Sequence, residues 1–293
     1  MKQYIIIILL LITASPLYSS DKPAYRIFRG DGTESSYRNM VSSLGEKDII
    51  LFGEVHGNPV AHWLEYELAG DLFRHCKDGG RNFIMGGEMF DADTQTVITE
   101  YLQGHISSRS FRSESRPWPN YERDYRRILE LAGTEKIPFI ATNVPKRYAS
   151  MVFRKGLDSL NNLSVSAKKY IAPLPIRFDA SLSSYRDIES RIPSNVPGHS
   201  SGHLAEAQAL RDATMAHFIF ANIKPGGLFF HINGSYHSAG REGIAWHLLQ
   251  RKPGLKIGII ATVSQKDIAH LREENKGIAD FILAVPASMP GAR

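Results

Sequence analysis

The chain has 293 residues, of which 43% are hydrophobic, 22% are charged and one is a cysteine. This length and composition fit one large globular domain, and the single cysteine excludes an internal disulfide. The formal net charge of +5 at pH 7 is mild. It suits an anionic ligand or a membrane surface, and it gives no support for nucleic-acid binding.

Residues 1–20 are predicted to be a secretory signal peptide. Lys2 gives a positive start, a nearly unbroken apolar run covers 4–12, and small residues follow at 13–20. The apolar run is shorter than a bilayer-spanning helix needs. No cysteine near the end of this segment offers a lipid attachment point. We therefore expect an exported protein of the periplasm or cell envelope, with 21–293 forming one α/β domain.

Beyond the signal peptide, strand-like and helical patterns alternate along the chain. This alternation predicts an α/β fold with a mostly parallel central sheet flanked by helices. The predicted strands cover 49–52, 83–85, 138–142, 228–232, 256–262 and 280–285. The predicted helices cover 61–76, 91–102, 121–132, 204–222 and 243–250. The stretch 157–203 is rich in proline, serine and asparagine, and we expect a small helical insertion or lid there.

A polar motif follows the first predicted strand. Gly53 and Gly57 let the backbone turn sharply and approach a ligand closely. Glu54 and His56 are two residues apart, so they lie on the same side of an extended chain, and His62 follows near the start of the next helix. The motif fits a metal or acid–base site. It equally fits a Glu–His pair that only ties a strand end to a helix.

Two more polar motifs follow predicted strands. Glu88 ends a Gly-Gly-Glu run after the second strand, and Tyr236 and His237 end a Gly-Ser-Tyr-His run after the fourth. Ligands bind at the carboxyl ends of the strands in open parallel sheets, so we expect His56, Glu88 and His237 to converge. A buried Glu88 needs a metal, histidine or arginine partner. The alternative is that Glu88 caps the following helix.

Two helical segments carry further candidates. Gln208 and Asp212 share one face of an alanine-rich helix, which indicates either contact with the site or a solvated face. Trp118, Tyr121 and Tyr125 gather at the start of another helix, where they fit either core packing or a ligand wall.

Taken in order, these motifs resemble the ChaN-like haem-binding uptake proteins of the Tiki superfamily. The ordered set covers about 49–262, most of the mature chain. The matching residues are Gly53-Glu54-Val55-His56-Gly57-Asn58 with His62, Gly87-Glu88-Met89-Phe90-Asp91 with Gln95, Trp118, Tyr121 and Tyr125, Ala141-Thr142-Asn143-Val144-Pro145, Gln208, Asp212, Met215 and Ala216, and Gly234-Ser235-Tyr236-His237 with Gly240, Gly243 and Ile244.

The resemblance implies an exported binding protein for haem or iron acquisition rather than an enzyme. It implies haem held through a tyrosine, with Tyr121 and Tyr125 as the candidates, and a homodimer with haem between the subunits. An outer-membrane haem receptor is the expected transport partner. The residues that the resemblance places around the cofactor are Tyr121, Tyr125, His62, Asn143, Arg147, Gln208, Asp212 and Tyr236.

The wider superfamily includes metal-dependent peptidases, which keeps a second function open. Under that reading Glu54, His56, Glu88 and His237 are the catalytic groups, and His56, Glu88 and His237 bind Zn, Mn or Co. Three protein ligands leave a coordination position for water. Relatives are often lipoproteins, and this chain departs from them because no lipobox cysteine follows the signal segment.

Overall fold

The computed structural model describes residues 21–188 and 203–289. The predicted signal peptide and part of the predicted insertion, 189–202, lie outside the described residues. Within the described part, no helix is both long and apolar enough to cross a membrane. Because the predicted signal peptide lies outside the described residues, the structure does not test the prediction of export.

The centre of the molecule is an eight-stranded sheet with the order β2-β1-β8-β7-β3-β6-β4-β5. The strands are β1 (Arg26–Arg29), β2 (Glu34–Ser35), β3 (Ile49–Glu54), β4 (Phe83–Asp91), β5 (Phe139–Asn143), β6 (Leu228–Gly234), β7 (Ile257–Gln265) and β8 (Phe281–Pro286). The strands from β8 to β5 run parallel, and β1 pairs antiparallel with both β8 and β2. The predicted α/β class with a mostly parallel sheet is confirmed.

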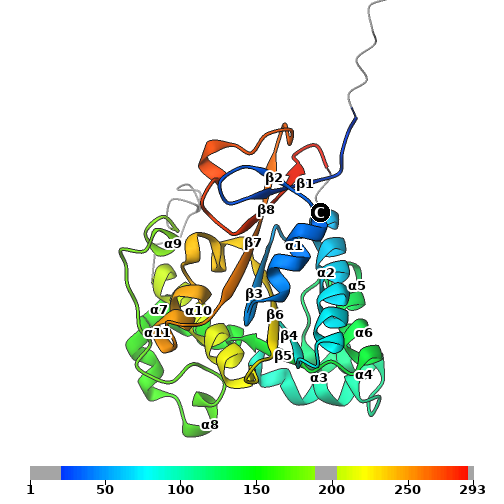
Figure 1. Ribbon diagram of the computed structural model, residues 1–293. Coiled ribbons are helices and arrows are strands. Elements are labelled where there is room, and N and C mark those ends of the chain that lie inside the picture. Colours follow the sequence, from blue (N-terminus) through cyan, green and yellow to red (C-terminus); the bar gives the residue numbers. More distant parts are fainter. Residues whose placement is uncertain (1–20, 189–202, 290–293) are drawn as a thin grey trace, which may run out of the picture.

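Helices cover both faces of the sheet (Figure 1). On one face lie α1 (Tyr37–Gly45), α2 (Pro59–Asp78), α3 (Gln95–Leu102), α4 (Ser108–Ser115), α5 (Tyr121–Asp124) and α6 (Arg126–Glu135). On the other lie α10 (Leu204–Asn222) and α11 (Ile244–Arg251), with α7 (Lys146–Lys155) packed against α10. Parallel strands buried on both faces read as continuous apolar runs, which is why the sequence pattern predicts them.

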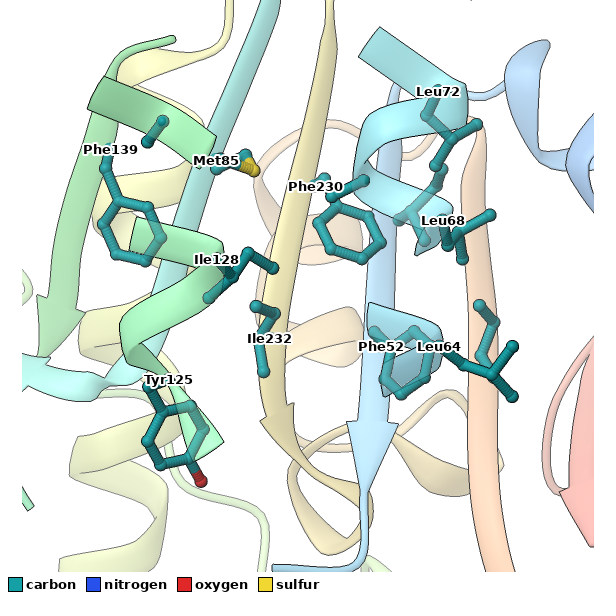
Figure 2. Packing of buried hydrophobic residues seen from close by; sticks show 14 of the residues in the cluster. Phe52, Leu64, Leu68, Leu72, Met85, Tyr125, Ile128, Phe139, Phe230 and Ile232 are labelled. Carbon is teal, nitrogen blue, oxygen red and sulfur yellow. The ribbon is translucent and has the colours of Figure 1, made fainter. Parts of the chain in front are cut away.

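Alternate residues of the central strands feed two separate cores. In β3, Ile50 and Phe52 face the core under α2, while Ile49 and Leu51 face the core under α10 and α11. Figure 2 shows Phe52 and Phe230 of the sheet packed toward the leucines of α2. Each fully buried side chain of this size contributes about 1.5–3 kcal/mol. The two cores hold β3 and β6 rigidly, and both strands end at the site.

The described part of the insertion packs on the domain. It contains a 3₁₀ turn at Leu157–Asn162 and two short helices, α8 (Val165–Lys168) and α9 (Ser183–Arg186). Leu160 and Ile171 join a third small core with α7 and α10. Glu242 accepts hydrogen bonds from the backbone amides of the first two residues of α9 at 3.1 and 2.6 Å. The described segment is thus anchored beside the carboxyl edge of the sheet.

At one edge of the sheet, the side chain of Gln95 forms hydrogen bonds with backbone groups of β5. Nε2 of Gln95 donates to the carbonyl oxygen of Phe139 at 3.0 Å, and the amide of Ala141 donates to Oε1 of Gln95 at 2.7 Å. The carboxamide therefore pairs with this edge as a neighbouring strand would.

Candidate functional site

The three predicted polar motifs meet at the carboxyl edge of β3, β4 and β6. Glu54 ends β3 directly opposite Gly234, which ends β6. The amide of Gly234 donates to Oε2 of Glu88 at 2.8 Å, and His237 lies on the 3₁₀ turn that follows β6. The predicted convergence of the strand ends is confirmed. Glu88 lies inside β4 and bonds across the sheet, so the alternative of a helix cap is wrong.

His56 stands at the open side of this cluster. Its Nδ1 lies 2.5 Å from Oε1 of Glu54, its side chain is half exposed, and its ring meets that of Trp118 edge-on at 5.2 Å. A β-carbon on Gly234 would lie 2.9 Å from Nε2 of His56, so only glycine leaves the ring in place. The hydrogen bond to Glu54 raises the pKa of His56 against the effect of burial. The Glu54–His56 pair therefore presents an imidazole at the surface.

His237 is the buried counterpart of His56. Its Nε2 lies 3.3 Å from Oε1 of Glu88, its Nδ1 makes a short hydrogen bond to Asp212, and Nε2 of Gln208 lies 3.1 Å from Nδ1. Burial alone would lower the pKa of His237, but the charges of Glu88 and Asp212 outweigh it and raise the pKa to about 10. Gln208 and Asp212 thus contact the site, and the alternative of a solvated helix face is wrong. Glu88 links both histidines, since its charge acts on His56 as well.

Tyr185 of α9 extends the hydrogen bonds behind His237. Its hydroxyl donates to Oδ2 of Asp212 at 2.9 Å and lies 3.4 Å from Nε2 of His247. Sequence reasoning missed Tyr185 and His247. Tyr185 lies in the irregular insertion, and His247 shows only as one position of an amphipathic helix.

A second buried cluster surrounds His62 beneath Glu54. Nδ1 of His62 lies 3.2 Å from Oε2 of Glu54 and 3.1 Å from Oε2 of Glu65, and Nε2 lies 3.5 Å from Oδ2 of Asp124. The hydroxyl of Tyr125 donates to Oε1 of Glu54 at 2.5 Å. Burial lowers the pKa of His62, but Glu65 and Glu54 override it and raise the pKa to about 10. Burial and the charge of Glu54 raise the pKa of Glu65 well above its ordinary value, which favours the neutral acid.

The sequence pattern missed Glu65 and Asp124 because acidic residues on helices usually mark a solvated face. The one available signal was spacing. Glu65 is three residues after His62, which places both on the same side of α2.

The tightest potential metal ligands differ from those predicted. Within the described residues, Glu54, His62 and Glu65 bring three ligand atoms within 4.8 Å of one another. The predicted trio of His56, Glu88 and His237 shares an edge of the sheet but is not gathered this closely. All three members of the tighter group are buried carboxylate or imidazole donors, a set that suits Zn, Mn or Co.

The candidate haem tyrosines have very different exposure. Tyr121 is 3% exposed and Tyr125 is 1% exposed, and both rings belong to the core under α6. Tyr236 is 64% exposed and directly precedes His237. The structure therefore presents the phenol of Tyr236, and not those of Tyr121 and Tyr125, to a ligand at the surface.

Asn143 and Arg147 take up different positions around the site. Asn143 is buried and its Nδ2 donates to the carbonyl oxygen of Glu88 at 2.9 Å, which fixes the strand that carries Glu88. Arg147 pairs with Asp93 at 2.6 Å and lies over the ring of Tyr148. Arg147 makes no ion pair or hydrogen bond with Glu54, Glu88 or the site histidines.

The fold and the site together define an α/β protein with a buried cluster of histidines and carboxylates at the carboxyl edge of a parallel sheet. The family model described as "Haem-binding uptake, Tiki superfamily, ChaN" matches residues 40–248, which is more than half of the chain. The chain belongs to this family.

The chain is similar to several solved structures and to one curated protein. A structure reported as cofacial haem binding to ChaN of Campylobacter jejuni superposes with a TM-score of 0.68 at 16% identity, covering 88% of this chain and 96% of that one. An erythromycin esterase, EreC, gives a TM-score of 0.48 at 11% identity over 92% of this chain and 98% of that one, a likeness too low to carry an argument. Protein RETICULATA-RELATED 5, chloroplastic, of Arabidopsis thaliana is 23% identical over 80% of this chain. The chain spans about a third of the length of that curated relative.

Proposed function

We propose that this protein binds haem at the carboxyl edge of its sheet and serves haem or iron uptake after export. Membership of the haem-binding uptake family supports the ligand. The observations that carry the position are the exposure of Tyr236, two residues after Gly234, and the half-exposed ring of His56, on the edge where the strand motifs meet.

The chemistry of the donors fits ferric haem. A tyrosine oxygen is a known axial ligand of haem iron, and the side chain of Tyr236 is exposed at the surface. Trp118 and His56 supply an aromatic wall against which a porphyrin can pack. Tyr125 serves a different purpose, because its hydroxyl is committed to buried Glu54.

A hemin titration tests this proposal. The full chain should develop a high-spin Soret band that saturates at micromolar hemin, and Tyr236→Phe should shift the band and weaken binding at least tenfold. Tyr148→Phe is the control, since Tyr148 lies beside Arg147 rather than in the strand-end cluster. Unchanged spectra in Tyr236→Phe would remove Tyr236 as the ligand, and an unchanged hemin spectrum with the wild type would remove haem binding.

The homodimer and an outer-membrane haem receptor belong to the same proposal. The solved ChaN structure is described as binding haem cofacially, and we infer that haem lies between two copies of this chain. Sedimentation of the chain with and without hemin checks this arrangement. A monomer at saturating hemin would contradict the dimer while leaving haem binding itself intact.

The arrangement of His237 favours a second function, hydrolysis. Asp212 and Glu88 hold the two nitrogens of a buried imidazole, and Glu54 holds an imidazole at the surface, so proton donors and acceptors stand ready on one edge. A metal in the Glu54, His62 and Glu65 group would supply Lewis acidity and an activated water. It would also release protons, because the pKa of His62 is raised to about 10.

Cobalt substitution tests the metal and its location. Co²⁺ bound at the buried group should give visible d–d absorption that is lost in Glu65→Gln and kept in Glu88→Gln. The opposite pattern would place the metal at His56, Glu88 and His237. No absorption, together with no ester or peptide cleavage in the presence of Zn, Mn or Co, would contradict the hydrolase.

A further inference from the structure

A small cavity is lined by His247, whose Nε2 lies 3.4 Å from the hydroxyl of Tyr185. Its volume is about 220 Å³, and it lies between the insertion segment 172–177 and the end of α11, with Ala213 of α10 as a further wall. Both polar and apolar side chains line it. The lining side chains are those of Pro173, Pro175, Ile176, Arg177, His247, Gln250 and Arg251.

Two of these side chains are arginines without an acidic partner. Many described arginines pair with a carboxylate, as Arg147 does with Asp93, but no described carboxylate lies within 4.0 Å of Arg177 or Arg251. Arg177 donates to Oε1 of Gln250 at 3.1 Å, and Arg251 lies 3.3 Å from Nδ1 of His217. Both of these contacts are with neutral acceptors. Two positive charges therefore face one cavity uncompensated within the described part of the protein.

The charges of both arginines act on the imidazole of His247. It is 6% exposed and lines the same cavity. Burial, followed by the charges of Arg251 and Arg177, lowers the pKa of His247 to about 4. Both arginines act on one point, so an anion placed there meets two attractive charges and a neutral ring that can share a hydrogen bond.

We propose that this cavity binds a small oxyanion, a carboxylate or phosphate group, between the guanidinium groups of Arg177 and Arg251. Guanidinium forks match the oxygens of such groups in pairs. Pro173 and Ile176 accommodate a short carbon skeleton attached to the anion. The volume is below the range of about 300–1,000 Å³ that holds larger ligands, which excludes a porphyrin.

The cavity is connected to the strand-end site through one hydroxyl group. Nε2 of His247 lies 3.4 Å from the hydroxyl of Tyr185, and that hydroxyl donates to Asp212, which holds Nδ1 of His237. A bound anion raises the proton affinity of the His247 ring. The hydrogen bond between this ring and the Tyr185 hydroxyl therefore changes. Occupation of the cavity therefore alters the hydrogen bonds that orient His237.

Titration of the full chain with inorganic phosphate and, separately, with acetate tests the proposal. Calorimetry should show one saturable site, and nuclear magnetic resonance should show the ring signals of His247 and then His237 moving with the same dissociation constant. Arg177→Gln and Arg251→Gln should each weaken binding roughly tenfold or more, because each removes a charge-assisted contact. Arg38→Gln is the matched control, since Arg38 is an exposed arginine on α1.

The two ligands distinguish the sources of the anion. Tighter phosphate than acetate identifies a phosphate site, and the reverse identifies a carboxylate site. Equal binding by the wild type and Arg177→Gln, or shifts that sodium chloride reproduces at the same ionic strength, would overturn the proposal. Arg177 lies in an exposed segment, so Arg177→Gln remains decisive if circular dichroism shows that Arg251→Gln fails to fold.

Discussion

The backbone amide of Gly234 donates a hydrogen bond to the buried carboxylate of Glu88 over 2.8 Å. Gly234 also leaves the room that His56 occupies, because a β-carbon there would lie 2.9 Å from Nε2 of that ring. One residue at the end of β6 thus holds a carboxylate from one neighbouring strand and admits an imidazole from the other.

Gly234→Ala should separate these two tasks. Its backbone angles, φ −60° and ψ 142°, suit alanine, and the group that must move is the end of a half-exposed side chain. We expect the free energy of unfolding to fall by less than about 1 kcal/mol, while the His56 ring signals shift and hemin binding weakens. Gly254→Ala, where a β-carbon meets nothing within 4 Å, is the control. An unmoved His56 would contradict the account of Gly234.

Tyr125→Phe should destabilise the protein by about 1–3 kcal/mol. The change removes the hydrogen bond that the buried Tyr125 hydroxyl donates to Oε1 of Glu54, and a hydrogen bond to a charged group contributes about 1.5–3 kcal/mol. The loss is moderated because Oε1 keeps its contact with His56. Urea unfolding measures the loss. Tyr121→Phe is the matched control, because no residue of the described part of the chain makes a hydrogen bond to the buried Tyr121 hydroxyl, and its removal should be nearly neutral. Equal effects of the two changes would contradict the role of the Tyr125 hydroxyl.

Stability should fall as the pH rises through the alkaline range. The pKa of His237 is raised from 6.5 to about 10 in the folded protein, so its contribution is fully present below pH 6.5 and is lost as the pH approaches 10. His62 has the same sign and the same window. The pKa of Glu88 is lowered from 4.5 to about 2, so its contribution is lost as the pH falls through that range. Unfolding curves between pH 2 and 10 should therefore show greatest stability near pH 5–6.

The protonation states of the buried histidine rings can be checked directly by nuclear magnetic resonance. At pH 8 the rings of His237 and His62 should still be imidazolium. His231 provides the contrast, because burial lowers its pKa to about 4 and its ring should be neutral at the same pH. A neutral His237 at pH 8 would contradict the pairing with Glu88 and Asp212.

Arg81→Gln should destabilise the amino-terminal edge of the sheet. The guanidinium of Arg81 donates to the carbonyl oxygens of Lys47 at 2.8 Å and Gly226 at 2.9 Å, which precede β3 and β6. Hydrogen bonds from charged groups contribute about 1.5–3 kcal/mol each, so we expect a loss of at least about 2 kcal/mol in urea unfolding. Arg154→Gln, at an exposed position on α7, should change stability by less than about 0.5 kcal/mol. A loss no larger than that of the control would contradict this role.

The parallel strands and the motifs that follow them were predictable because a strand buried on both faces appears in the sequence as a continuous run of apolar residues. Strands β1 and β2 show no such run, since they are four and two residues long. The pattern at 121–132 predicts one helix, but two helices, α5 and α6, meet at Tyr125, whose hydroxyl donates to Glu54. This hydrogen bond joins residues 71 positions apart, and no local sequence pattern contains such a contact.

The site was predictable in its outline and not in its depth. His56, Glu88 and His237 could be placed because each follows a strand, and strand ends share an edge. Asp124 and Tyr185 could not, because the site residues that they contact, His62 and Asp212, lie on other elements. Glu65 lies on the same helix as His62, but its sequence surroundings resemble an ordinary helix surface. The exposure of Tyr236 against the burial of Tyr121 and Tyr125 likewise depends on packing between segments.

The carboxamide of Gln95 on β5 has a consequence for how copies of this protein can meet. If the sheets of two copies joined through β5, the carboxamide of Gln95 would first have to move away from this strand. It would lose its two hydrogen bonds to the β5 backbone before any new one formed. Fibre-like growth through that strand is thereby discouraged, and a mutant with leucine in place of Gln95 would lose the safeguard.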